Sequence, residues 1–164
     1  MNIFILSKKP KTAARMQCDK HVVKMILEST QMLSTAHHIH GSRVKLSTIY
    51  RPAYQNHPCT VWARQTFGNY QWLLAHAEAL AQEYTRRYGK THKSSRLIAG
   101  SLQYNPCPKG RRTAFAQAMP DKYKVHGDAV QAYRQYYIHE KTRAIAMTWR
   151  TRSVPKFITE RNER

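Results

Sequence analysis

Glu28 lies among basic residues in the segment 18–40. If this segment is helical, steps of three and four place His21, Lys24 and Glu28 on one polar stripe. A carboxylate beside an amine can stabilise a cationic intermediate and move protons. The chain has only nine Asp and Glu against 28 Lys and Arg, so an acid in this setting is rare. Glu28 is therefore the first candidate for a catalytic residue. The alternative is an ordinary surface ion pair with Lys24.

An amine nucleophile would complete such a site, and two kinds of amine are available. An α-amine ordinarily titrates near 8 and leaves roughly a tenth of the group neutral at pH 7, whereas a lysine titrates near 10.4. The amine of Met1 is therefore the first candidate. Lys24 is the second, and Lys20 could compete if it were buried.

Metal and cofactor chemistry have weaker support in the sequence. Two pairs have ligand types that bind zinc, namely Cys18 with His21 and His57 with Cys59. Neither pair has further ligands at a standard spacing, so we expect no metal. The chain also lacks a glycine-rich phosphate loop and a Gly-x-Ser-x-Gly motif, which argues against ATP use and serine hydrolysis. We expect no cofactor.

The net charge of +19 points to a polyanionic partner, with double-stranded DNA as the first candidate. Residues 86–124 carry ten Lys or Arg and one Asp. The alternative is a solvated basic surface with no ligand. Candidate phosphate contacts are Arg51, Arg64, Arg111 and Arg112, and aromatic side chains that could wedge the stack or hold a flipped base are Trp149, Tyr70 and Trp72. The alternative for each of these residues is a place in the core or on the plain surface.

The totals predict one domain spanning residues 1–164 and a monomer. No apolar run reaches the 18 or so residues of a membrane span, and the run at residues 3–6 is too short for a signal peptide. Three widely spaced cysteines without a C-x-x-C pair are typical of a reducing compartment. We therefore expect an intracellular protein, in the cytoplasm at DNA, with no membrane association.

The patterning predicts an all-α fold with a short N-terminal arm, about three main helices and long irregular basic loops. The first main helix is expected at 19–40, with Asp19 as N-cap and Gly41 as its stop. The second is expected from an N-cap at Thr60 to Tyr88, with a break near residues 68–69, and the third at 128–141. Short helices are expected from Thr12 and within 94–102.

Several of these features occur together, in order, in one family. The segment Asp19-x-His21-Val22-Val23, with Glu28 seven positions after His21, follows a short N-terminal arm. A histidine in Asn-His-Pro (His57) precedes the second helix, Glu-Tyr-Thr-Arg-Arg-Tyr-Gly closes it at 83–89, and an aromatic, basic segment surrounds Trp149. This arrangement resembles the pyrimidine-dimer DNA glycosylases of the phage endonuclease V type.

The resemblance implies a compact helical protein that kinks duplex DNA, extrudes a base and breaks the glycosidic bond with an amine assisted by a carboxylate. It would make Glu28 the carboxylate, His21 a neighbour of the site and the N-terminal amine the nucleophile. Two departures stand out: Leu27 occupies the place of the family's typical arginine, and the bulky Asn2 disfavours removal of Met1.

The leading hypothesis is thus a DNA glycosylase that also cleaves the strand as an abasic-site lyase. Its expected DNA contacts are Asn2, Lys20, Arg51, His57, Arg64, Arg111, Arg112 and Trp149. One alternative is a non-catalytic DNA-binding or architectural protein. Another is an enzyme of the same fold that modifies unusual DNA bases. This alternative stands because Leu27 occupies the place of the family's typical arginine.

Overall fold

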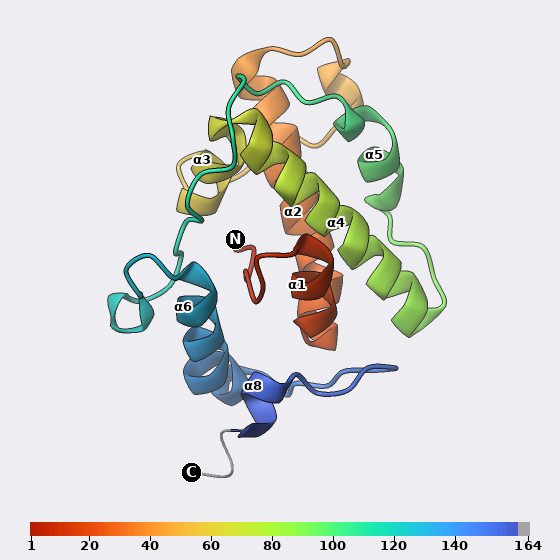
Figure 1. Ribbon diagram of the computed structural model, residues 1–164. Helices are drawn as coiled ribbons and strands as arrows, with labels where there is room; N and C mark the ends of the chain where they lie inside the picture. The colour runs from red at the N-terminus through yellow and green to blue at the C-terminus, as the bar shows by residue number, and fades with distance from the viewer. Residues whose placement is uncertain (161–164) are drawn as a thin grey trace.

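The computed structural model describes residues 1–160 and is helical, with no β-strand among them. Two 22-residue helices, α2 (Asp19–His40) and α4 (Phe67–Tyr88), pack against each other. The short α1 (Pro10–Met16) packs on α4, as Figure 1 shows. The predicted all-α class and the compact arrangement are confirmed.

Helix α2 has the predicted limits and the predicted core face. Val22, Ile26 and Leu33 are fully buried, because steps of three and four keep them on one side of the helix. Gly41, with φ +70°, ends the helix in a backbone conformation that glycine adopts most readily. The N-cap prediction was wrong: Cys18 is the N-cap, and Asp19 is the first helical residue.

The second predicted helix is two helices, α3 (Pro58–Gln65) and α4. The break lies at Thr66 rather than at 68–69, because the Thr66 hydroxyl accepts the Asn69 N–H and caps α4. Likewise, His57 rather than Thr60 caps α3, through the Cys59 N–H. The predicted end is confirmed, since Gly89 follows α4 in the left-handed conformation.

Gly68 allows a basic segment to lie across the start of α4. A Cβ at this position would come 2.3 Å from the Arg112 backbone nitrogen, so only glycine fits. Backbone hydrogen bonds from Phe67 to Pro108 and from Gly68 to Gly110 hold the segment in place. Arg111 and Arg112 are therefore displayed on a fixed, exposed strip of chain.

Short helices interrupt the other connections. They are η1 (Leu46–Thr48), α5 (Ser95–Ala99), η2 (Ser101–Gln103) and η3 (Asp121–Tyr123). The predicted helix within 94–102 thus corresponds to α5 and the start of η2.

The third predicted helix changes its winding part-way. It begins as α6 (Ala129–Tyr136), with the Asp128 carboxylate accepting the Gln131 N–H. It continues as a π-helical turn, η4 (Tyr137–Lys141), and ends in α7 (Thr142–Ala144). A π turn shifts the side chains that follow relative to a regular helix, and such turns are frequent at functional sites. The last described helix is α8 (Lys156–Thr159).

The N-terminal arm, residues 1–6, is buried between α2 and α6. Ile3, Ile5 and Leu6 are fully buried, and Phe4 is 4% exposed. The Gln17 side-chain amide donates to the Ile3 carbonyl (2.8 Å), and Arg134 of α6 donates to the Leu6 carbonyl (3.1 Å). Figure 1 accordingly shows the N-terminus in the middle of the molecule.

A buried ionic network joins α2, α4 and the C-terminal segment. Arg87 forms ion pairs with Asp19 and Glu83, both at 3.1 Å, and Glu83 also pairs with Arg152. Asp19 further accepts the Arg150 N–H and the Thr148 hydroxyl proton. Its carboxylate is therefore occupied by residues far along the chain, which explains why it does not cap α2.

Within residues 1–160, no helix is both long enough and apolar enough to cross a bilayer.

Candidate active site

The first two residues of the chain meet Glu28. The Met1 amine nitrogen lies 3.6 Å from Glu28 Oε2, and the Asn2 backbone N–H donates to the same oxygen at 2.8 Å. The ammonium of Lys24 lies 3.5 Å from the other carboxylate oxygen, Oε1. Glu28 is only 7% exposed. The structure thus brings together a carboxylate and both predicted amines.

Asn2 sets the direction of the N-terminal arm. Its side-chain oxygen accepts the N–H groups of Ile3 (2.8 Å) and Phe4 (3.3 Å), which turns the chain back on itself. Its amide nitrogen donates to the Ala118 carbonyl at 2.8 Å. Asn2 is 8% exposed, and its side chain forms its hydrogen bonds within the protein.

His21 lies two turns before Glu28 on α2 and is buried. Its Nδ1 is 2.5 Å from the Tyr137 hydroxyl, and its ring stacks on Phe4 with 4.3 Å between ring centroids. Burial, followed by the positive charges of Lys141 and Lys24, lowers the pKa of His21 to about 4. The imidazole is therefore neutral at neutral pH.

His57 and Cys59 close another side of the site. Burial is the main cause of the lowered pKa of His57; the positive charge of the Met1 amine lowers this pKa further, whereas the negative charge of Glu28 raises it. The Cys59 sulfur lies 3.9 Å from the Asn2 side-chain oxygen. Burial raises the pKa of the Cys59 thiol to about 11, so it stays protonated and is a poor nucleophile.

A known protein family matches the part of the chain that contains Met1, His21, Glu28 and His57. The family described as pyrimidine dimer DNA glycosylase matches residues 1–96. The chain belongs to the pyrimidine dimer DNA glycosylase family. Membership indicates a DNA glycosylase in broad terms and a DNA substrate. No curated protein and no solved structure matches the chain.

Parts of this family member's site come from beyond the matched region. The Tyr137 hydroxyl forms a hydrogen bond with His21, and the charge of Lys141 lowers the pKa of His21. The Ala118 carbonyl accepts a hydrogen bond from the Asn2 side chain. Reasoning from the sequence missed all three. They lie more than 100 residues from their partners, and no local pattern indicates which side chains the π turn directs toward α2.

The predicted phosphate contacts are spread over several elements. Lys20 is exposed on α2, Arg51 is exposed in the loop before α3, and Arg111 and Arg112 are exposed in the segment over α4. Arg64 of α3 donates to the Gln55 carbonyl at 2.6 Å. Of the predicted site residues, the structure therefore places Met1, Asn2 and Lys24 against the Glu28 carboxylate.

The predicted aromatic wedges differ in burial. Tyr70 is fully buried and Trp72 is 7% exposed, and each donates a hydrogen bond to a backbone carbonyl. These two are core residues, which contradicts the interpretation of them as wedges. Trp149 is half-buried, with its indole N–H donating to the Met16 carbonyl at 2.9 Å.

An apolar pair lies on the exposed side of α2 next to the site. Val23 and Leu27, one turn apart, are 37% and 40% exposed. Leu27 directly precedes Glu28 in the chain, so an exposed aliphatic side chain lies beside the carboxylate residue.

No three His, Cys, Asp or Glu side chains between residues 1 and 160 gather in a way that could hold a metal ion. The two pairs considered for zinc are therefore not joined by a third ligand. Cys18 instead lies beside Tyr137, with the Tyr137 hydroxyl 3.8 Å from its sulfur, and Cys59 lies beside Asn2.

Proposed function

We propose that this family member excises a damaged or modified pyrimidine from duplex DNA and then cleaves the strand as an abasic-site lyase. Met1 supplies the nucleophilic amine and Glu28 the assisting carboxylate. The observation that carries the proposal is the 3.6 Å separation between the Met1 nitrogen and Glu28 Oε2.

The chemistry needs a proton acceptor next to the amine. The neutral amine forms a bond to C1′ of the extruded nucleotide while the glycosidic C–N bond breaks, and the base leaves with the bonding electrons. Glu28 takes a proton from the new C1′–N group and returns it to O4′ as the sugar ring opens, which gives a protonated imine. Loss of a C2′ proton then expels the 3′ phosphate, and water releases the enzyme.

Other residues have supporting roles in this proposal. His21 is neutral and fixed beside the site, so it can donate a hydrogen bond without adding charge. Asn2 holds the amine in place and does not contact DNA. The proposed contacts to DNA are Lys20, Arg51, His57, Arg64, Arg111, Arg112 and Trp149.

Borohydride trapping tests the proposal directly. We expect a covalent adduct between the protein and a duplex that carries a thymine dimer. Glu28→Gln should slow adduct formation by about a hundredfold or more, since proton transfer contributes about 10²–10⁴ in rate, and should leave duplex binding intact. Glu78→Gln is the matched control, because Glu78 accepts from Gln103 on the far side of α4 and the variant removes the same charge. If Glu28→Gln traps as fast as Glu78→Gln, the proposed role of Glu28 is wrong.

The same adduct identifies the nucleophile and the substrate. Peptide mass spectrometry should place the link on Met1, and Lys24→Gln should still trap. An adduct on Lys24 would reverse this assignment. Duplexes that carry modified pyrimidines instead of a dimer identify the base, and adducts with those alone would favour an enzyme that acts on unusual bases.

A further inference from the structure

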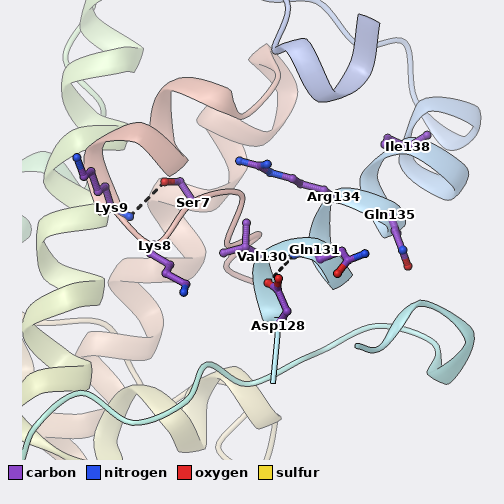
Figure 2. A pocket seen from close by; sticks show the side chains of 9 residues that line it. All are labelled: Ser7, Lys8, Lys9, Asp128, Val130, Gln131, Arg134, Gln135 and Ile138. Atoms are coloured by element: carbon purple, nitrogen blue, oxygen red, sulfur yellow. Dashed lines mark hydrogen bonds between the residues drawn. The ribbon is translucent and has the colours of Figure 1, made fainter. Parts of the chain in front are cut away.

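A cavity of about 650 Å³ lies between the end of the N-terminal arm and the outer side of α6. Figure 2 shows its nine lining residues: Ser7, Lys8, Lys9, Asp128, Val130, Gln131, Arg134, Gln135 and Ile138. None of them belongs to the Met1–Glu28 site. The volume lies within the range of about 300–1,000 Å³ that is typical of small-molecule pockets.

Arg134 is held in place with its terminal nitrogens free. Its Nε donates to the Leu6 carbonyl at 3.1 Å, and its guanidinium lies 5.1 Å from the centre of the Phe157 ring. Within residues 1–160, no carboxylate pairs with Arg134 and no acceptor bonds to its two terminal nitrogens. An anchored guanidinium with a free fork is well suited to a phosphate group.

The opposite wall supplies further donors from a fixed backbone. The Lys8 carbonyl accepts the Trp72 indole N–H at 2.8 Å, and the Pro10 carbonyl lies 3.0 Å from His76 Nδ1, so α4 holds this turn. The Ser7 hydroxyl accepts the Lys9 N–H, which leaves its own proton to donate. In Figure 2 the Lys8 and Arg134 side chains extend into the space from opposite walls, while Lys9 points away from α6.

The remaining lining suits a nucleoside. Val130 of α6 and Ile138 of η4 give an apolar surface, and Gln131 supplies amide groups that can bond to a base edge. Asp128 is the one acid in the lining, and one oxygen of its carboxylate is occupied by the Gln131 N–H. Lys8 and Arg134 against this one acid leave the cavity positive.

We propose that this cavity binds a nucleotide, with the phosphate between Arg134, Lys8 and Ser7 and the nucleoside against Val130. The nucleotide could be free or part of a DNA strand. If the nucleotide is part of a DNA strand, the cavity is a second DNA contact separate from the Met1–Glu28 site, and this alternative rests on the proposed function. Binding of a free nucleotide does not rest on it.

Calorimetric titration with thymidine 5′-monophosphate, thymidine and hexathymidylate tests the inference on the full chain. The monophosphate should bind at least about tenfold more tightly than thymidine, because charge-assisted hydrogen bonds reach only the phosphate. Lys8→Gln should weaken monophosphate binding about tenfold, and Arg134→Lys, which keeps the charge but loses the fork, by several-fold. Lys90→Gln, the same charge change on exposed chain after α4, should have no effect.

The source of the nucleotide follows from the third ligand. If Lys8→Gln weakens hexathymidylate as much as the monophosphate, the site holds a DNA strand; if it weakens the monophosphate alone, the site holds a free nucleotide. Equal binding of thymidine and its monophosphate, or equal effects of Lys8→Gln and Lys90→Gln, would overturn the proposal. Glu28→Gln should leave all of these affinities unchanged, so failure of this site and failure of the proposed catalysis are distinguishable.

Discussion

His76 links the N-terminal arm to the core through two hydrogen bonds that require its neutral form. Its Nδ1 lies 3.0 Å from the Pro10 carbonyl and therefore carries the proton, so Nε2 accepts from the Gln17 amide. Gln17 in turn donates to the Ile3 carbonyl. Burial lowers the pKa of His76 to about 4, as it does for His21. A second proton on His76 would make Nε2 a donor that faces the donating amide of Gln17. The Gln17 amide would then move away, and its hydrogen bond to the Ile3 carbonyl would be lost.

The free energy of unfolding should therefore fall in mild acid. Above about pH 6.5 these histidines are neutral in both states, so their contribution is fully present there. As the pH falls from 6.5 toward 4, the unfolded chain binds protons first, and we expect each of these histidines to contribute a loss of roughly 2–3 kcal/mol by pH 4.5. Urea unfolding at several pH values measures it. His76→Gln should flatten the dependence, whereas the exposed His126→Gln should not; equal slopes in all three proteins would contradict this account.

At the scale of elements, the ionic network around Arg87 joins the C-terminal segment to the helices. Arg87 is 5% exposed and donates to the Gln17 and Arg15 carbonyls as well as to its two carboxylates. The network therefore fixes the end of α1, the start of α2 and the end of α4 together.

Arg87→Ala should destabilise the protein by about 3–5 kcal/mol, because it leaves Asp19 and Glu83 buried and short of a partner. Arg86→Ala is the matched control: Arg86 is the exposed neighbour on the same helix, and we expect a change of about 0.5 kcal/mol or less. Chemical denaturation compares the two. Similar losses would show that the network contributes little.

The helices and their ends were largely predictable, whereas the contacts between elements were not. Asp19 and Gly41 indicated the limits of α2, and Gly89 indicated the end of α4. Asp19 has the side chain of a good N-cap, but its carboxylate binds Arg87, which is 68 residues away. The proximity of Met1 and Glu28 was predicted through the family resemblance, while the covering of the site by Ala118 and Tyr137 depends on how α6 docks. No local pattern encodes that docking.

At the scale of the whole molecule, the charge of +19 is spread over surfaces on several elements. The buried acids Asp19 and Glu83 pair with the buried Arg87, and the buried Glu28 pairs with the Met1 amine. Few acids are thus left on the outside to oppose a polyanion, and the exposed surface is dominated by basic side chains. Family membership indicates that this polyanion is DNA.

Duplex affinity should consequently fall steeply with salt. The logarithm of the association constant should decrease linearly with the logarithm of the salt concentration, with a slope of about −0.9 per phosphate contacted. Lys20→Gln should remove one phosphate contact and so reduce the magnitude of that slope by about 0.9. Because the contact is to phosphate, the reduction should be the same for every duplex sequence. Fluorescence anisotropy over a range of salt concentrations measures both slopes, and an unchanged slope would remove Lys20 from the DNA-binding surface.

The burial of the arm between α2 and α6 has a consequence for biosynthesis. Tyr133, Arg134 and Tyr137 cover residues 1–6 but are translated more than 100 residues after them. Until these residues have left the ribosome, the apolar run from Ile3 to Leu6 has only part of its final cover. The catalytic centre that we propose can therefore be assembled only after α6 has been synthesised and has docked on the arm.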